Sequence, residues 1–281
     1  MGQGTNATDE WEIERLDLGA YLHRVGHDGD TAPSADTLAA LHREHLDAIA
    51  FENIDVALGR GIAVDLDSVQ AKLVQRRRGG YCYEHGVLLA AVLERLGFTV
   101  ERFLARVGGE EVERPRATTH MTLRVTIGSE RWLADVGFGS GLLRPLPFDD
   151  AAPHAQGAWT FAVASTGPRS WALRELRNGE WITRYGFDEQ RLHAADVVMA
   201  NHFTSTFERS PFVGKVVVVR KDEDSIRSLI DRRLSLERPD GSVDERDVGY
   251  DELAALLRDQ FAIALSDAEI AQLTFASSAP G

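Results

Sequence analysis

One short stretch constrains the fold of this chain more than any other. Residues 76–86, RRRGGYCYEHG, contain the only cysteine in 281 residues, Cys82, directly after a pair of glycines. Apolar residues follow it at helical spacing: Val87, Leu88, Ala91, Val92 and Leu96. Gly97 stands where a C-terminal cap would end this helix. The pattern therefore places Cys82 at a helix N-terminus, behind a loop whose glycines allow a tight turn.

Two roles for Cys82 are compatible with this position. Unpaired N–H groups and the positive end of the helix dipole favour the thiolate, as a nucleophile requires. The alternative is a buried structural thiol, which is the commoner role of a single cysteine. The stretch alone leaves both interpretations open.

Composition narrows the function classes. With 31 basic and 44 acidic residues the net charge is −13, which argues against general binding of nucleic acids or anionic membranes. A polyanionic small molecule would need a local basic patch, for which the candidates are 76–78 and 215–221; a solvated charged face is the alternative for each. The chain lacks a membrane-length apolar run, its first residues do not resemble a signal peptide, and one cysteine permits neither an internal disulfide nor a thiolate metal site. We expect a cytoplasmic protein without a metal.

Hydrophobic patterning predicts an α+β chain in three parts. Residues 1–97 are predicted to form a helical bundle. One helix covers 16–25, a second begins after a cap at Ser34, a third covers 69–75 after a cap at Asp67 or Ser68, and a fourth begins at Cys82. Residues 50–61 are predicted to form a loop. Residues 98–198 form a β-barrel or strongly twisted antiparallel sheet, because apolar residues alternate from about 99 to 181. Residues 199–281 contain a strand over 215–220, a hairpin over 232–248, two helices over 251–260 and from Ser266, and a disordered tail, SSAPG.

A base for Cys82 can be sought in the segment 119–139, THMTLRVTIGSERWLADVGFG. If Gly128-Ser129 is a two-residue hairpin turn, Ile127 faces Glu130 and one face of the hairpin becomes almost wholly apolar. In that register His120 and Asp135 are diagonal neighbours on the other face. A carboxylate beside an imidazole fixes its tautomer and stabilises the imidazolium, so Cys82, His120 and Asp135 make a papain-like arrangement. The alternative is an ordinary polar strand pair with a solvated histidine.

A second pair of histidines has the spacing of some metal sites. His42 and His45 form an HxxH pattern on the helix after Ser34, but no third ligand is evident nearby. We therefore favour partly buried helix histidines over a metal site.

Several motifs in a fixed order resemble those of the arylamine N-acetyltransferase family. They are RGGYCYEH, TTHMTLRV and LADVGFGS, with LHREHLDAIAFENIDVALGR upstream and NHFTSTFERSPFV downstream, and together they span most of the chain. The resemblance implies three domains: a helical bundle that carries the cysteine, a β-barrel that carries His and Asp, and an α/β lid. It also implies that Cys82, His120 and Asp135 are a catalytic triad.

The resemblance further implies the substrates. Acetyl-CoA would be the donor and an arylamine or arylhydrazine the acceptor, in a ping-pong reaction through an acetyl-cysteine. Carried over by position, Phe51, Phe138 and Phe212 would line the acyl and arene pocket, and Thr119 would lie by the thiol end of the coenzyme. Partners are small molecules rather than nucleic acid or membrane, and a homodimer stays open.

The chain departs from the family pattern at three places: Gly86 stands for the usual Asn, Ala50 for Pro, and Phe207-Glu208 for His-Pro. The last two lie near the expected pocket and bear on the choice of acceptor. Two other functions stay open. The same triad could serve an amide synthase or a thioester or amide hydrolase, and the fold could belong to a silent binding protein.

Overall fold

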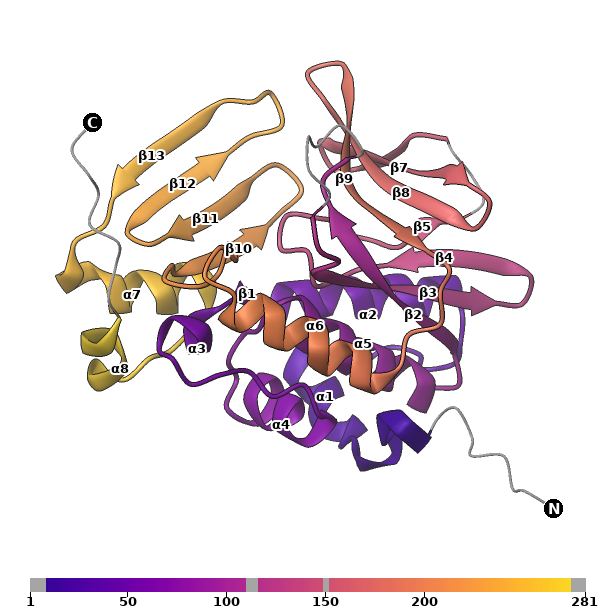
Figure 1. The fold of residues 1–281 in the computed structure, drawn as a ribbon, viewed down its shortest axis with the longest axis horizontal. Helices are drawn as coiled ribbons and strands as arrows, with labels where there is room; N and C mark the ends of the chain where they lie inside the picture. The colour runs from indigo at the N-terminus through magenta and orange to yellow at the C-terminus, as the bar shows by residue number, and fades with distance from the viewer. Residues whose placement is uncertain (1–8, 110–115, 149–151, 274–281) are drawn as a thin grey trace.

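The computed structural model describes residues 9–109, 116–148 and 152–273. The polar start of the chain, up to residue 8, and the SSAPG tail lie outside the described residues, so the predictions made for them stay predictions. Figure 1 shows the N-terminal helices beneath two sheets, with the C-terminal sheet on one side and the larger sheet on the other.

The first part of the chain is helical, as predicted. Asp17 caps the first helix, and Ser34 accepts the N–H of Thr37 at the start of the second. The elements are two 3₁₀ turns (Asp9–Trp11 and Ile13–Arg15), α1 (Leu18–Val25), α2 (Ala35–Ala48), α3 (Ile54–Ala57), α4 (Leu66–Gln70), a π-helical turn (Ala71–Gln75) and α5 (Cys82–Arg95).

The helix that begins at Cys82 lies at the centre of the molecule. Every residue of α5 from Cys82 to Leu93 is buried, and the helix packs against α1, α4 and the strands β2 (Thr99–Val107) and β3 (His120–Ile127). A helix buried on all sides is fixed by packing rather than by its own propensity. Its N-terminus is therefore held firmly against the second part of the chain.

Two local predictions were wrong. The segment predicted as a loop forms β1 (Phe51–Glu52), which pairs with a strand more than 160 residues later, and then α3. The helix predicted to start after Asp67 or Ser68 begins at Leu66, because the carboxylate of Asp65 accepts the N–H of Ser68 at 2.9 Å. Both errors reflect partners that local patterning does not show.

The middle of the chain forms an eight-stranded antiparallel sheet that curls into a nearly closed, barrel-like shape. The strand order is β5-β4-β3-β2-β9-β8-β7-β6, and β5 packs against β7. The predicted β-rich region extends further than residue 181, through β9. Besides β2 and β3 the strands are β4 (Glu130–Ala134), β5 (Leu146–Pro147), β6 (His154–Gln156), β7 (Trp159–Gly167), β8 (Ser170–Arg177) and β9 (Glu180–Asp188).

The predicted hairpin register is confirmed. Ile127 pairs with Glu130 across the turn, and Leu123 pairs with Ala134 further along the same two strands. Gly128 has φ +60°, the conformation that a type II′ turn requires at its first central residue. Apolar side chains of one face, such as Met121 and Val125, are buried in the main core.

The third part joins a second sheet to two helices. The sheet has the order β1-β10-β11-β12-β13, so the N-terminal part contributes its first strand. The predicted strand, hairpin and two helices are confirmed with small shifts at their ends. The elements are α6 (Ala194–Thr206), β10 (Val217–Lys221), β11 (Ile226–Ile230), β12 (Arg233–Glu237), β13 (Val243–Asp247), α7 (Tyr250–Phe261) and α8 (Asp267–Gln272).

The two sheets contact each other directly. The ammonium of Lys221 on β10 donates to the carbonyls of Ser140 and Gly141 at 3.1 and 2.9 Å, and the indole of Trp159 donates to the carbonyl of Asp222 at 2.9 Å. Because α6 spans 194–206, the predicted division between 198 and 199 falls inside a helix, and the three-domain division stays a prediction. Within the described ranges, no helix combines the length and the apolar character needed to cross a bilayer.

Candidate active site

The sulfur of Cys82 lies against the backbone on both sides of His120. Its thiol donates to the carbonyl oxygen of Thr119 at 3.5 Å, and the sulfur accepts the N–H groups of Tyr83 and Met121. Cys82 is only 3% exposed. The start of α5 thus brings the thiol against the backbone at the beginning of β3.

The charge state of Cys82 differs from expectation. Burial raises the pKa of the thiol well above its ordinary value, and the negative charge of Asp135 raises it further. The N–H groups of Tyr83 and Met121 act in the opposite direction but are outweighed. The expectation of a resting thiolate at this helix start is therefore not met, because desolvation exceeds the effect of the N–H donors.

His120 and Asp135 form a buried pair. Nε2 of His120 lies 2.6 Å from Oδ2 of Asp135, and the two residues are 2% and 3% exposed. Since a carboxylate accepts at Nε2, the neutral ring carries its proton there and has Nδ1 free to accept another. The pairing predicted from hairpin register is confirmed, and the alternative of a solvated histidine is excluded for this structure.

Two further groups hold the carboxylate of Asp135. Oδ1 accepts the N–H of Gly137 at 2.9 Å, and the hydroxyl of Tyr185 also donates to the carboxylate. Burial alone would raise the pKa of Asp135, but His120, Tyr185 and the Gly137 N–H hold it below its usual range. Asp135 is therefore a carboxylate at neutral pH and favours a positive charge on His120.

Aromatic rings surround this pair. Phe138 meets the ring of His120 edge-on, with centroids 5.1 Å apart, and Tyr185 lies 4.8 Å from it. Phe51 and Phe212 form a second contact at 5.9 Å, although β1 and the 207–216 segment are far apart in the sequence. The structure thus places all three predicted phenylalanines in two small aromatic groups, of which the first touches the candidate base.

Two glycines permit close packing around Cys82. A Cβ on Gly137 would lie 2.8 Å from the carbonyl oxygen of Cys82 and 2.9 Å from its Cα. At Gly86 the side chain of Met121 occupies the space, 3.1 Å from where a Cβ would stand. The unusual residue at position 86 therefore lets β3 approach α5 directly beside the sulfur.

Sequence reasoning missed two residues of the site. His42, taken only as a helix histidine, accepts the N–H of Asp135 at 3.2 Å through Nε2. Tyr185 belongs to β9, beyond the stretch that alternation identified. Neither contact has a local signal in the sequence, because both join segments more than 45 residues apart.

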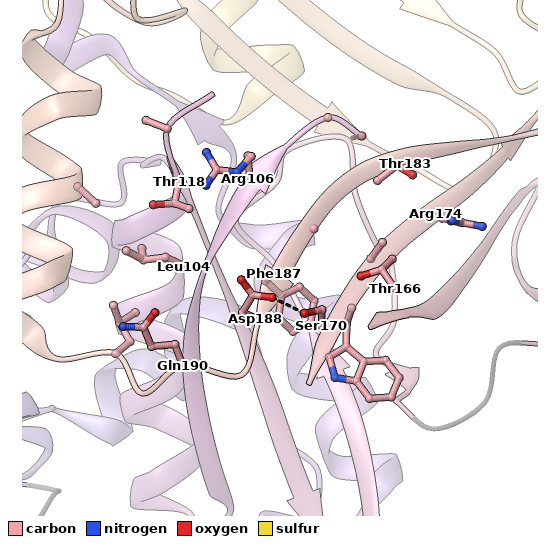
Figure 2. A pocket seen from close by; sticks show the side chains of 18 of the residues that line it. Leu104, Arg106, Thr118, Thr166, Ser170, Arg174, Thr183, Phe187, Asp188 and Gln190 are labelled. Carbon is pink, nitrogen blue, oxygen red and sulfur yellow. Dashed lines mark hydrogen bonds between the residues drawn. The ribbon is translucent and has the colours of Figure 1, made fainter. Parts of the chain in front are cut away.

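A large cavity of about 1300 Å³ opens between the barrel-like sheet and α6. Figure 2 shows Arg106, Thr118 and Arg174 among its lining side chains. None of the seven predicted site residues lines it, and its nearest approach along the chain is Thr118, next to Thr119. Nε of Arg174 is buried without a hydrogen-bond partner among the described residues, and Arg106 is exposed. Trp181 and Phe203 supply apolar surface.

The basic stretches noted in the sequence do not line this cavity. Arg78 is buried and pairs with Glu52 at 2.9 Å, and Lys221 is buried against the 140–141 carbonyls, whereas Arg76 and Arg77 are exposed. Each stretch is therefore divided between interior and surface. In the described part of the chain, no cluster of three or more His, Cys, Asp or Glu has the arrangement of a metal site.

Comparison with known proteins identifies relatives across most of the chain. A family model described as N-acetyltransferase matches residues 34–270. An arylamine N-acetyltransferase of Mycolicibacterium smegmatis is 37% identical over 230 residues, covering 79% of this chain and 83% of the relative. An arylamine N-acetyltransferase of Escherichia coli is 32% identical over 259 residues, covering 90% of each chain.

Solved structures show the same similarity. The arylamine N-acetyltransferase of Nocardia farcinica superimposes with a TM-score of 0.86 at 39% identity and covers 95% of this chain and 96% of its own. The Mycobacterium marinum arylamine N-acetyltransferase in complex with CoA gives a TM-score of 0.83 at 30% identity and covers 92% of this chain and all of its own.

Proposed function

This chain belongs to the arylamine N-acetyltransferase family and is an acyltransferase, and from that membership we propose that it transfers an acetyl group from acetyl-CoA to an arylamine or arylhydrazine through Cys82. The observation that carries the proposal is the buried His120–Asp135 pair at 2.6 Å, with the sulfur of Cys82 against the backbone on both sides of His120. Nucleophile, base and orienting carboxylate then act as a triad.

In the first half-reaction, the thiol of Cys82 loses its proton to Nδ1 of His120 as the sulfur attacks the thioester carbonyl. Because the pKa of the buried thiol is raised, transfer occurs with the attack, and the carboxylate of Asp135 stabilises the imidazolium. N–H groups of the first turn of α5 donate to the oxyanion. The tetrahedral intermediate collapses, the C–S bond to the coenzyme breaks, and His120 returns the proton to the leaving thiolate.

In the second half-reaction, the amine attacks the acetyl-cysteine. His120 takes the proton that the amine nitrogen loses, and returns it to the Cys82 sulfur as the C–S bond breaks. Aromatic amines suit this step, since their low basicity leaves them neutral and nucleophilic at neutral pH. Phe51, Phe138 and Phe212 would offer flat apolar rings to the acceptor. A ping-pong rate law follows because the coenzyme leaves before the amine reacts.

The cavity beside Thr118 suits the coenzyme. A relative of the same fold is known in complex with CoA. The pantetheine arm can lie on the apolar lining near Trp181 and Phe203, and the guanidinium groups of Arg106 and Arg174, which line the same cavity, can bind phosphates. Thr119 would then lie by the thiol end of the coenzyme, between the cavity and Cys82.

The C-terminal part, 199–281, would act as a lid. Phe212 from this part meets Phe51 of β1, and Lys221 bonds the 140–141 carbonyls next to Phe138, so the lid closes the aromatic groups from one side. Water excluded in this way would leave the acetyl-cysteine for the amine. We place this chemistry in the cytoplasm, where acetyl-CoA and a reduced thiol are both available.

Intact-protein mass spectrometry after mixing with acetyl-CoA tests the proposal. The wild type should gain one acetyl group, which disappears when an arylamine such as 4-aminobenzoate is added, and Cys82→Ala should gain none. Absence of the adduct on wild type would refute acyl transfer and favour a silent binding protein. An adduct that vanishes without amine would indicate hydrolysis.

A further inference from the structure

The HxxH pair on α2 is fully engaged with protein partners. His42 and His45 are each 0% exposed, and all four of their ring nitrogens lie within hydrogen-bond distance of another protein atom. No nitrogen is left for a metal ion. The pair therefore has another role, and the two side chains contact different parts of the site: His42 contacts Asp135, and His45 contacts His85.

His42 leads to the candidate carboxylate. Its Nε2 accepts the N–H of Asp135 at 3.2 Å, so this nitrogen carries no proton. Nδ1 then donates to the carbonyl of Leu143 at 3.3 Å. The ring bridges the residue after β4 to the segment eight residues further on, and fixes the backbone from which the Asp135 side chain projects.

His45 leads to the loop before the nucleophile. Nε2 of His85 lies 3.0 Å from the carbonyl of Gly80 and 3.3 Å from that of Ala50, so it must donate. Nδ1 of His85 is then an acceptor, which receives Nε2–H of His45 at 2.8 Å. The remaining nitrogen of His45 accepts the hydroxyl of Tyr21 at 2.9 Å. All bonds of this chain point the same way and end two residues before Cys82.

We propose that His42 and His45 are positioning residues: His42 sets the backbone of Asp135, and His45, through His85, sets the loop that delivers Cys82. The two histidines lie three positions apart on one helix, so α2 acts as a spacer between the two halves of the site. The proposal rests on the function proposed above. It adds that the distance between Cys82 and the His120–Asp135 pair depends on α2, none of whose residues lines the cavity.

The geometry distinguishes positioning from simple core packing. An apolar residue could replace His42 or His45 without loss of hydrogen bonding only if the groups that these histidines contact had other partners. The buried Asp135 N–H would instead lose its acceptor, and the backbone could relax to find another. A shift of about 1 Å in a catalytic group can slow a reaction about 100-fold.

Matched variants of His42 isolate the bond to Asp135. In His42→Gln the side-chain oxygen can stand where Nε2 stands and accept the same N–H. In His42→Asn the amide nitrogen stands near Nδ1 and keeps only the bond to Leu143. We expect His42→Gln to retain most of the rate of Cys82 acetylation, and His42→Asn to lose about 10- to 100-fold.

A pH profile supplies the readout that packing alone would not move. If Asp135 is displaced, its carboxylate stabilises a positive charge on the His120 ring less. The acid-side midpoint of the acetylation rate should therefore move to lower pH in His42→Asn but not in His42→Gln. For the second arm, His45→Gln keeps a donor for His85, whereas His45→Phe does not, and only His45→Phe should slow acetylation.

The outcomes separate this proposal from the function on which it rests. Wild-type protein that forms no acetyl adduct refutes the function itself. A wild type that is acetylated, with Gln and Asn variants of His42 equal in rate and in pH midpoint, refutes the positioning role. Far-UV circular dichroism on each variant identifies any that fails to fold, and the Gln variants, which preserve a hydrogen bond, keep the test decisive in that case.

Discussion

Acidification should reveal the burial of His42 quantitatively. In the folded chain, burial lowers the pKa of His42 to about 4, and Arg43 acts in the same direction, while Asp135 and the carbonyl of Leu143 act against it. In the unfolded chain the same ring has its ordinary value of 6.5. Between these two pKa values, the His42 ring is therefore protonated in the unfolded state and neutral in the folded state.

The sign and size of the effect follow from linkage. A depressed histidine pKa leaves stability at its full value above 6.5 and removes stability progressively as the pH falls toward 4. Between about pH 7.5 and pH 5 the unfolded ring becomes almost fully protonated and the folded ring stays mostly neutral. At about 1.4 kcal/mol per pH unit, over about 1.5 units, the loss of unfolding free energy is about 2 kcal/mol.

Urea denaturation of wild type and His42→Gln at both pH values measures this term. Other groups titrate in the same range, including Glu84, whose pKa burial raises to about 7, and His85, whose pKa burial lowers to about 4. The difference between the two proteins cancels these common terms. The stability advantage of wild type over the variant should shrink by about 2 kcal/mol on acidification. A difference that does not change with pH would refute the reasoning.

Two other substitutions test the site. Gly137→Ala would place a methyl group against the backbone of Cys82, so we expect the free energy of unfolding, measured by urea denaturation, to fall by about 1–3 kcal/mol and acetylation of Cys82 to be slow. Gly167→Ala, where the added methyl group has room, is the control. Normal acetylation of Gly137→Ala would contradict the packing. Arg106→Gln should raise the KM for acetyl-CoA about 10-fold, because one charged hydrogen bond to a phosphate is lost. Arg258→Gln, at an exposed position away from the cavity, should leave the KM unchanged. Equal KM values for the two variants would show that Arg106 does not bind the phosphates.

Local sequence was a reliable guide where a partner lies within a few residues. The caps at Ser34 and Ser266 and the hairpin around Gly128 need only neighbouring residues, and each is found as predicted. The His120–Asp135 pair belongs to the same class, since register across a short turn fixes which side chains share a face.

Prediction failed where partners are distant. Residues 51–52 become a strand only because β10 lies beside them, and the contact of Asp135 with His42 joins residues 93 positions apart. The lining of the cavity, from β2, β8, β9 and α6, likewise has no sequence signal. Hydrogen-bond partners at such separations are chosen by the packing of whole elements.

The sequence by itself determined which residues could do the chemistry and their order along the chain: one cysteine at a helix start, then a histidine and an aspartate on one hairpin face. Tertiary structure decided the burial, the pKa values and the hydrogen-bond partners of these residues. It buried Cys82 so deeply that its pKa rises rather than falls, because desolvation depends on everything packed around the sulfur. It also placed two histidines of α2 behind the site, where only the folded chain brings them.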